Sequence, residues 1–532
     1  MWLLIPSPGL PAPSPPIDSY TVATDTVPSA DLYDAPVYYE RNLDRYTRKG
    51  DLELLRAGKV RVQHYDPVDV TNFAWSKAGT EYTWWMQMEE MRFLLPLISS
   101  SRRSDHELAK QWLARWYTVH VSAGVKPHLW GEPMTFAYRA MVFVYYLKTE
   151  ERRESPDAEI VEMLRTSIRK HQEHLIPDHN FDRDNNHGMI DALGLLETTR
   201  VFPHRGARAL ALERIATMVS NSVSDAGVEL EHAAVYHFIF LRWLDEILEY
   251  TRDLPGAPSD FVARMESVSA AMHGAAYFMH DHRGWIAPIG DTDSVSVDYY
   301  SRELRKKRAP NGARALHDPK SGYAIYKGKK HRRDARYVIF RQPQRILMTA
   351  HAHGDAMALF LGYDGEVLLG DAGRYSYTPG ATRSYFKSPS AHNTVLLPPP
   401  PGMASPSLPV VTAVRDVSTP DTTIWTADLT LGPLLASRVV RIPIGARDVV
   451  VNDAIFDTDA DSTAGQRVTV QWHIGKDVRS LEETRNGENG VWEWKLTTRR
   501  GKHARLQMEV HGDSTATDPE LTIVHGEKEP ML

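Results

Sequence analysis

The sequence contains no cysteine among its 532 residues. This absence excludes disulfide bonds, thiolate metal sites, iron–sulfur clusters and a cysteine nucleophile. Any metal must therefore be bound by His, Asp, Glu or backbone oxygen atoms. No run approaches the roughly 18 apolar residues that span a bilayer. The first residues lack the basic stretch and apolar core of a secretory signal, so we expect a protein that stays inside the cell, or one whose leader is absent from this chain.

The sequence also has little excess of charge of one sign. The 62 Lys and Arg residues face 68 Asp and Glu residues, and the net charge of −6 argues against general binding of polyanions such as nucleic acids. One segment departs from this balance, because residues 302–345 hold fifteen basic and only three acidic residues. Most runs of this kind are solvated faces or loops, but this basic tract lies across a predicted domain junction, where clefts commonly form, so we expect it to hold an anionic ligand.

The first part of the chain consists of a proline-rich segment followed by a region with helical spacing of apolar residues. Eight of the 34 prolines lie in the first 36 residues, which predicts an extended arm over residues 1–39. Apolar residues at three- and four-residue spacing then predict helices over 105–121, 134–148, 157–174, 207–220, 237–252 and 259–279. Their helix–break–helix rhythm favours an α-toroid or solenoid over a four-helix bundle. We therefore expect residues 40–315 to form a helical domain.

The apolar period changes after about residue 320. Short β-rich runs bounded by Gly, Asp and Pro predict strands over 337–340, 357–360, 367–369, 449–451, 467–474, 491–497 and 505–510. No long helical pattern separates them, which is typical of an antiparallel β-sandwich. The predicted fold class is thus a multidomain α+β chain, with the β-sandwich over residues 316–532.

The strongest chemical motif lies in the β half. It comprises His351-Ala-His353-Gly-Asp, Asp371 and His392. We expect the first motif to lie in a strand, so that His351 and His353 point to the same face, which suits one metal or a base beside a metal ligand. Asp371 and His392 would complete a two-His, one-carboxylate set that matches Zn²⁺. The alternative is that these histidines bond to backbone on a polar sheet face.

Two further candidate groups lie in the helical half. Asn186 and His187, in a loop that opens into a helix, could donate to a carboxylate or an oxyanion, although simple helix capping explains the same pattern. Tyr236, beside His237 and before a predicted helix, could be a proton donor or a base, or could pack at the helix start. The sequence has no P-loop, strand-linked GxGxxG, GxSxG or HExxH motif, so nucleotide, nicotinamide and serine-hydrolase chemistry lose support.

The order of these motifs resembles the heparinase II/III-like polysaccharide lyases. The matching segments are residues 371–377 (DAGRYSY), 390–395 (SAHNTV) and 289–293 (IGDTD). The resemblance implies an N-terminal incomplete (α/α) toroid followed by a C-terminal antiparallel β-sandwich. It also implies β-elimination at a 4-linked uronic acid within an anionic polysaccharide or oligosaccharide.

The resemblance further implies roles for individual residues. Asn186 and His187 would neutralise the uronate carboxylate, while Tyr236 and His351 would share the base and acid roles. A structural divalent metal, commonly zinc, would be bound by His353, Asp371 and His392. The expected substrate contacts are Tyr385, Arg383 and Trp130.

Several alternatives stay open at this point. The basic tract favours a heparin or heparan sulfate-type glycosaminoglycan, with alginate or another acidic exopolysaccharide as the alternative. A glycoside hydrolase would need a carboxylate pair, for which Glu229, Glu231, Asp291 and Asp293 are candidates. A glycan-binding protein without turnover is a third class, which the presence of all four expected catalytic residues disfavours. A homo-oligomer is compatible with the sequence.

Overall fold

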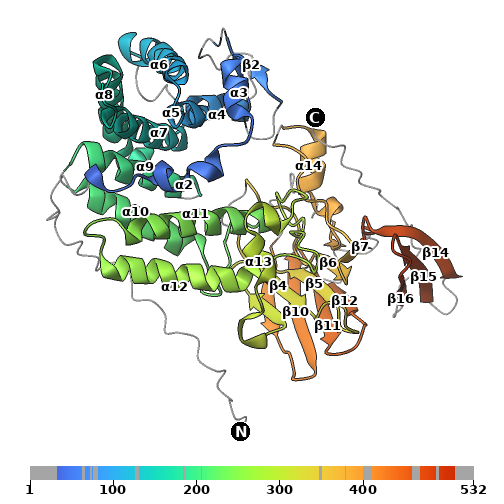
Figure 1. Ribbon diagram of the computed structural model, residues 1–532. Coiled ribbons are helices and arrows are strands. Elements are labelled where there is room, and N and C mark those ends of the chain that lie inside the picture. The colour runs from blue at the N-terminus through green and yellow to red at the C-terminus, as the bar shows by residue number, and fades with distance from the viewer. Residues whose placement is uncertain are drawn as a thin grey trace. The chain divides into compact units, whose positions relative to one another are not determined.

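The computed structural model describes residues 33–62, 66–71, 73, 75, 82–125, 131–183, 186–204, 206–346, 350–377, 379–398, 410–457, 468–486 and 491–509. The chain forms two compact units, and Figure 1 labels helices and strands that they contain. The first comprises residues 1–219 and 249–263, and the second comprises residues 220–248 and 264–532. The predicted domain ranges 1–39, 40–315 and 316–532 stay a prediction. The compact units follow another division, because residues 220–248 and 264–314 join the β-rich part.

Helices build the first unit. Their bounds are α2 Tyr38–Tyr46, α3 Asp51–Arg56, α4 Tyr82–Glu89, α5 Leu95–Ile98, α6 Arg103–Tyr117, α7 Pro133–Glu151, α8 Ala158–Leu175, α9 His187–Val201 and α10 Ala207–Ser222. α7 packs against both α8 and α9, and all residues of α9 from Gly188 to Val201 are buried. The helices predicted from apolar spacing are therefore confirmed. Among the described residues, no helix combines the length and apolar character needed to cross a membrane.

The segment before α2 is held by two buried cations. Lys148 Nζ donates to the Ala35 carbonyl at 2.9 Å, and Arg200 donates to the carbonyls of Ala35 and Pro36 at 2.9 and 3.0 Å. Burial lowers the pKa of Lys148 to about 8. The described end of the predicted N-terminal arm is therefore tied to α7 and α9, while residues 1–32 lie outside the described part of the chain.

Three helices contribute residues to both units, namely α10, α11 (Ala234–Arg252) and α12 (Ser259–Ala276). The second unit contains a five-stranded antiparallel sheet in the order β3-β4-β5-β6-β7. Its strands are β3 Ala315–Asp318, β4 Tyr323–Lys327, β5 Arg336–Arg341, β6 Leu359–Tyr363 and β7 Glu366–Leu369. The change from helix to strand thus occurs where the sequence pattern changes.

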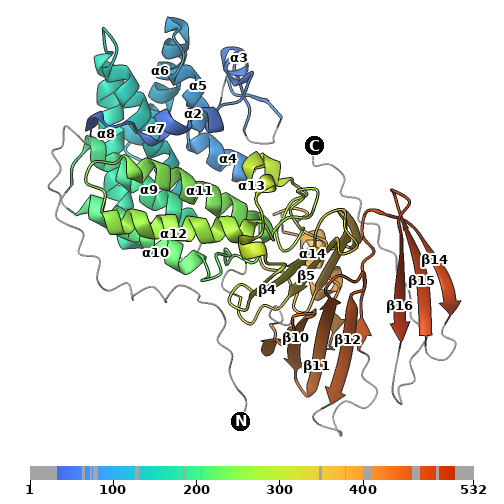
Figure 2. The same cartoon turned by 60° about the horizontal axis from the view of Figure 1, so that its bottom comes forward.

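A second antiparallel sheet, in the order β12-β11-β10-β9, packs on the first. Its strands are β9 Ala413–Asp416, β10 Thr422–Leu431, β11 Leu434–Pro443 and β12 Val450–Asp457. Val338 and Phe340 of one sheet share a core with Trp425, Ala436 and Val440 of the other. Figure 2 shows strands of the two sheets, β4 and β5 and β10 to β12, next to each other. This packing is the predicted β-sandwich.

Smaller strand pairs complete the second unit. β8 (Val395–Leu396) pairs with β13 (Thr469–Val470). A three-stranded sheet of β14 (Val478–Asn486), β15 (Val491–Thr498) and β16 (His503–Glu509) buries Trp492 and Trp494 together with Leu496. Of the predicted strands, 467–474 contains only the short β13.

We expect Lys327 to make the stability of the second unit depend on pH. Its ammonium is buried at the end of β4, donates to the Tyr277 carbonyl at 2.6 Å and lies 4.3 Å from the centroid of the Tyr277 ring. Burial lowers its pKa from 10.5 to about 7. Between these values the unfolded chain binds more protons than the folded protein, so stability rises with pH.

We expect this lysine to raise the free energy of unfolding by up to about 1.4 kcal/mol per pH unit between pH 7.5 and 9.5. Urea denaturation across this range should show the rise, and Lys327→Met should remove it. Lys320→Met, which changes an exposed lysine of the same tract, should keep the wild-type slope. Equal slopes for Lys327→Met and the wild type would contradict this explanation.

Candidate active site

Tyr236 lies in the first turn of α11. The start of this helix is attached to residues 289–292, since Ala234 N donates to the Ile289 carbonyl at 3.3 Å and Val235 N to Thr292 Oγ1 at 3.1 Å. The Tyr236 ring stacks on the His351 ring, with centroids 4.0 Å apart and an interplanar angle of 25°. The structure therefore brings together the two residues expected to share the acid and base roles.

His351 and His353 lie in a loop before β6, so the prediction that they lie in a strand is wrong. They nevertheless converge on one carboxylate. His351 Nδ1 lies 3.2 Å from Asp291 Oδ2, and His353 Nε2 lies 2.9 Å from Asp291 Oδ1. Arg383 bonds to both oxygens of the same carboxylate, with Nη2–Oδ2 at 2.6 Å. Asp291 thus fixes two histidines and an arginine at once.

Asp291 is charged in this setting. Burial alone would raise the pKa of its carboxyl, but the hydrogen bonds from His351, His353 and Arg383 outweigh burial and lower the pKa well below its usual range. The backbone adds a further tie, because Asp291 N donates to the His351 carbonyl at 3.1 Å. A buried, ionised carboxylate with this many donors is a rigid support for the neighbouring imidazole.

Gly290 explains how the two loops approach each other. Its φ is +58°, and a Cβ atom there would lie 2.4 Å from the His232 carbonyl oxygen and 2.9 Å from the His351 carbonyl oxygen. Only glycine fits this conformation and this space without strain. The IGDTD segment therefore uses Gly290 to bring Asp291 under the histidine loop.

A second carboxylate approaches His351 from the segment before α11. Glu231 Oε2 lies 3.7 Å from His351 Nε2, so each ring nitrogen faces a carboxylate. Glu231 N in turn donates to Glu229 Oε1 at 3.0 Å. Burial, followed by the like charge of Glu231, raises the pKa of Glu229 well above its usual range.

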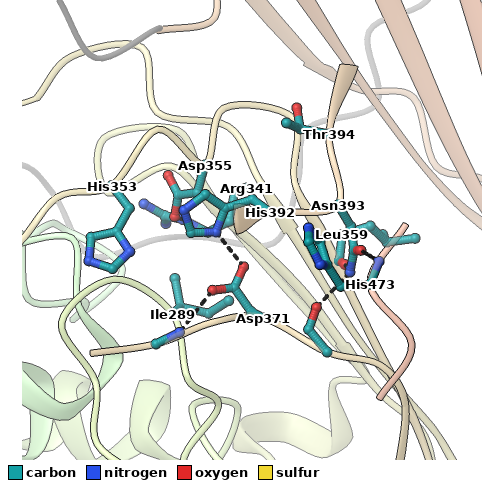
Figure 3. Close-up of polar contacts among 12 residues, drawn as sticks. Ile289, Arg341, His353, Asp355, Leu359, Asp371, His392, Asn393, Thr394 and His473 are labelled. Carbon is teal, nitrogen blue, oxygen red and sulfur yellow. Dashed lines mark hydrogen bonds and ion pairs between the residues drawn. The ribbon is translucent and has the colours of Figure 1, made fainter. Parts of the chain in front are cut away.

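The predicted metal ligands lie close together in the second unit (Figure 3). His392 Nδ1 bonds to Asp371 Oδ2 at 2.9 Å, and the His353 and His392 rings lie 5.4 Å apart. Among the described residues, His353 Nδ1 and His392 Nε2 are buried nitrogens without a hydrogen-bond partner. Within the same part of the chain, no group of three or more His, Asp and Glu side chains is arranged as it would be around a metal ion. The donor chemistry of two imidazoles and a carboxylate nonetheless fits zinc.

The SAHNTV segment is held by its own polar side chains. Asn393 Nδ2 donates to the carbonyls of Leu359 and Gly370, at 2.7 and 2.6 Å, and thereby joins the start of β6 to the end of β7. Thr394 bonds to the Ala356 carbonyl. These contacts place His392 beside Asp371, which explains why Asn and Thr follow the histidine.

Asn186 and His187 belong to the first unit. Asn186 is the N-cap residue of α9 and is 4% exposed, and its side chain makes no capping hydrogen bond. His187 is the first residue of the helix. Gly188 follows because a Cβ atom there would lie 2.0 Å from the Asp182 carbonyl oxygen. The expected loop-to-helix transition is confirmed, but the Asn186 side chain does not cap the helix.

The expected substrate contacts differ in their settings. Tyr385, on α14 (Ala381–Lys387), is 40% exposed. Arg383, on the same helix, is engaged by Asp291, and its side chain is 11% exposed. Trp130 lies outside the described residues.

Of the fifteen basic residues of the tract, three are buried, eleven are exposed, and Arg314 is half-buried and pairs with Asp334 at 2.7 Å. Arg336 and Arg341 are buried and pair with Asp334 and Asp355, each with an Nε–Oδ distance of 2.9 Å. Together with Lys327, they lie in the interior of the β-rich unit. The exposed members are Arg302, Arg305, Lys306, Lys307, Arg308, Lys320, Lys329, Lys330, Arg332, Arg333 and Arg345.

Two contacts of the site were not anticipated from the sequence. Tyr377 lies with its hydroxyl 2.7 Å from that of Tyr236, and Asp291 organises the histidine loop. Both residues stand in segments that carry the family resemblance, DAGRYSY and IGDTD, which was the available signal.

Comparison with known proteins agrees with the fold described above. Residues 310–398 match the family model described as Heparinase II/III-like, C-terminal. Two crystal structures of the heparan sulfate lyase HepC from Pedobacter heparinus are similar to this chain. The mutant has a TM-score of 0.61 at 13% identity, and the other structure has a TM-score of 0.59 at 14% identity. They cover 86% and 88% of this chain and 75% and 79% of their own chains.

A crystal structure of heparinase III has a TM-score of 0.61 at 11% identity and covers 92% of this chain and 93% of its own. A search among curated proteins found no match. At such identities the structural similarity establishes the fold, which confirms the predicted helical toroid followed by an antiparallel β-sandwich. The family match over residues 310–398 and the shared fold confirm the predicted resemblance to the heparinase II/III-like family.

Proposed function

We propose that the protein cleaves a uronic-acid-containing glycosaminoglycan, of the heparin or heparan sulfate type, by β-elimination to give 4,5-unsaturated uronate products. The observation that carries this proposal is the stacked pair of Tyr236 and His351, 4.0 Å apart, with Asp291 behind the imidazole. An acid and a base side by side suit a reaction that removes one proton and delivers another.

The reaction requires three changes at the uronate. A base removes the proton from C5, the bond from C4 to the glycosidic oxygen breaks as a C4–C5 double bond forms, and the leaving oxygen takes up a proton. We propose that Tyr236 and His351 perform the two proton transfers. Which of them removes the C5 proton depends on the epimer, because glucuronic and iduronic acids present C5–H on opposite faces.

The C5 proton is weakly acidic until the carboxylate is stabilised in its enolate-like form. We propose that Asn186 and His187 supply this stabilisation, because amide and imidazole donors at the start of a helix suit an anionic group. Electrostatic stabilisation of this kind is usually the largest single contribution to lowering a barrier.

A glycosaminoglycan is favoured by the exposed basic residues of the tract over 302–345. These side chains, which include Arg302, Arg305 and Lys306 on α13 (Arg302–Lys306), would attract a polyanion at long range. Alginate and other acidic exopolysaccharides remain the alternative substrates, since they carry the same uronate chemistry with lower charge density.

The contacts of the candidate carboxylates weigh against glycoside hydrolysis. Asp291 is bound by two histidines and Arg383, and Asp293 is paired with Arg374 at 3.1 Å. Glu229 is buried beside Glu231. A hydrolase needs one carboxylic acid and one carboxylate that both reach the glycosidic bond.

The test is a panel of heparin, heparan sulfate, chondroitin sulfate, hyaluronan and alginate, followed by ultraviolet absorbance of the unsaturated product. We expect absorbance to grow with heparan sulfate-type chains and to stay flat with the Tyr236→Phe variant. New reducing ends without this chromophore would overturn the lyase and support the hydrolase. If the absorbance grew with alginate and with no other polymer, alginate would take the place of heparan sulfate as the proposed substrate.

We also propose that His353, Asp371 and His392 bind a structural divalent metal, most simply zinc. Support comes from the two unpartnered buried ring nitrogens and from the N, N, O donor set. A bound metal would cross-link the histidine loop, the segment after β7 and the segment before β8.

Elemental analysis of the purified protein should therefore find one metal per chain. We expect His353→Ala and His392→Ala to lose the metal and to lower the melting temperature, because metal-binding free energy contributes to folding. His331→Ala, which removes an imidazole that is 73% exposed, serves as the control and should retain both. A wild-type protein without stoichiometric metal would refute the metal proposal and leave the lyase proposal standing.

A further inference from the structure

Tyr377 contacts both members of the proposed acid–base pair. Its hydroxyl lies 2.7 Å from the Tyr236 hydroxyl, and its ring meets the His351 ring edge-on, with centroids 5.9 Å apart and an angle of 66°. The three side chains come from α11, from the loop before β6 and from the extended segment after β7. Tyr377 is 44% exposed, whereas Tyr236 is half-buried, so the hydrogen bond joins a partly enclosed phenol to one that reaches solvent.

Two arginines hold the Tyr377 ring. The guanidinium of Arg374 lies 4.4 Å and that of Arg383 lies 5.4 Å from the ring centroid. Each arginine is itself fixed by a carboxylate, Arg374 by Asp293 at 3.1 Å and Arg383 by Asp291 at 2.6 Å. Fixed cations beside a phenol ring stabilise negative charge on its oxygen.

The two hydroxyls sit in different electrostatic settings. The ionisable groups that face them are Glu231, Asp291, Asp293, His351, Arg374 and Arg383. Burial raises the pKa of Tyr236 well above its usual range, and Tyr377 and Glu231 add to that rise. Burial also raises the pKa of Tyr377, but Arg374 and the hydrogen bond with Tyr236 counteract burial, while Asp291 and Asp293 add to the rise. Tyr377 is therefore the hydroxyl on which a negative charge is less costly.

We propose that Tyr377 is a positioning residue for Tyr236 and relays its proton to and from solvent. This proposal rests on the proposed function. If Tyr236 is the acid, it ends the reaction as a phenolate, takes the proton of the Tyr377 hydroxyl, and Tyr377 regains a proton from water. If Tyr236 is the base, it ends the reaction protonated; the Tyr377 hydroxyl then releases its own proton to water and takes the proton of Tyr236, which regenerates the Tyr236 phenolate. One proton moves through the pair per turnover in either case.

The test is the dependence of turnover on a small buffer, because a diffusing proton carrier can replace a missing relay. We expect Tyr377→Phe to lower kcat by about 10-fold or more at low buffer concentration, with KM unchanged. Imidazole, added at constant pH and ionic strength, should restore kcat of this variant and leave the wild type unaffected. A purely structural role of Tyr377 would not make turnover respond to buffer.

Tyr363→Phe is the matched control. It removes a hydroxyl that donates to the Arg333 carbonyl at 3.3 Å on β6 of the same unit, and it should behave as the wild type. Circular dichroism and thermal melting check that Tyr377→Phe is folded. Should that variant fold poorly, Arg374→Gln removes the nearer cation and keeps Tyr377, and it should give the same buffer-dependent loss of kcat.

The outcomes separate the two levels of the proposal. A folded Tyr377→Phe with wild-type kcat, or with a lower kcat that imidazole leaves unchanged, would overturn the relay alone. A wild-type protein that forms no unsaturated product from any uronate polymer would overturn the proposed function, and the relay with it.

Discussion

Replacing Tyr236 by Phe, or His351 by Ala, should lower kcat by about 10²–10⁴-fold, the range that a positioned acid or base contributes. The phenylalanine keeps the ring that stacks on His351 and loses only the hydroxyl that bonds to Tyr377. The alanine removes the imidazole that faces both Asp291 and Glu231. Because each change acts on a proton transfer, KM should move far less than kcat.

Initial rates from the absorbance of the unsaturated product measure this effect, and melting temperature confirms that the variants are folded. Tyr299→Phe, at a site that is 65% exposed on the same unit, provides the control for loss of a phenol hydroxyl. Tyr236→Phe with the wild-type rate would show that the stacked pair does not perform the chemistry.

The second large effect concerns the buried carboxylate that supports His351. Asp291→Asn keeps the shape of the side chain but removes the charge that holds His351, His353 and Arg383. Breaking a buried ion pair by removing one partner typically costs about 3–5 kcal/mol of stability, and here Asp291 is fully buried while the Arg383 side chain is 11% exposed. We also expect kcat to fall by about 10²-fold, since a catalytic group displaced by an ångström costs that much.

A double variant separates the two consequences of this change. Arg383→Met in the Asp291→Asn background removes the unpaired guanidinium, so the free energy of unfolding should recover a large part of the loss. Turnover should stay low, because His351 still lacks its carboxylate. Chemical denaturation and initial rates report the two quantities independently. Recovery of both, or of neither, would argue against the assigned role of Asp291.

Local periodicity was sufficient to predict the helices. The segment predicted over 134–148 is α7, Pro133–Glu151, and the segment predicted over 157–174 is α8, Ala158–Leu175. These helices begin and end at prolines, at Asp157 or at loop residues whose preferences are strong and local. The β-sandwich was predictable for the same reason, since short runs between turn residues leave no room for crossover helices.

Local periodicity could not predict that the HxH motif lies in a loop rather than in a strand. The run over 357–360 looks like a strand, but Met357 has a φ of +62°, and β6 begins only at Leu359. Gly354 allows the preceding loop to approach Pro389, because a Cβ atom there would lie 2.7 Å from the proline Cδ. Such contacts between distant segments override the local pattern.

The roles of Asp291 and Tyr377 were equally out of reach of local reasoning. Asp291 meets His351 across 60 positions of sequence, and Tyr377 meets Tyr236 across 141 positions. Spacing along the chain carries no information on pairings of this length. The family resemblance located the segments, and only the three-dimensional arrangement showed which side chains face one another.

The division of the chain into compact units has a consequence for recombining such enzymes. Tyr236 lies in residues 220–248, which belong to the same unit as His351 and Tyr377 although they are helical and far away in sequence. A chimera joined at residue 315, where helices give way to strands, would inherit Tyr236 from one parent and His351 from the other. A functional exchange of the β-rich part should therefore carry residues 220–248 and 264–314 along with it.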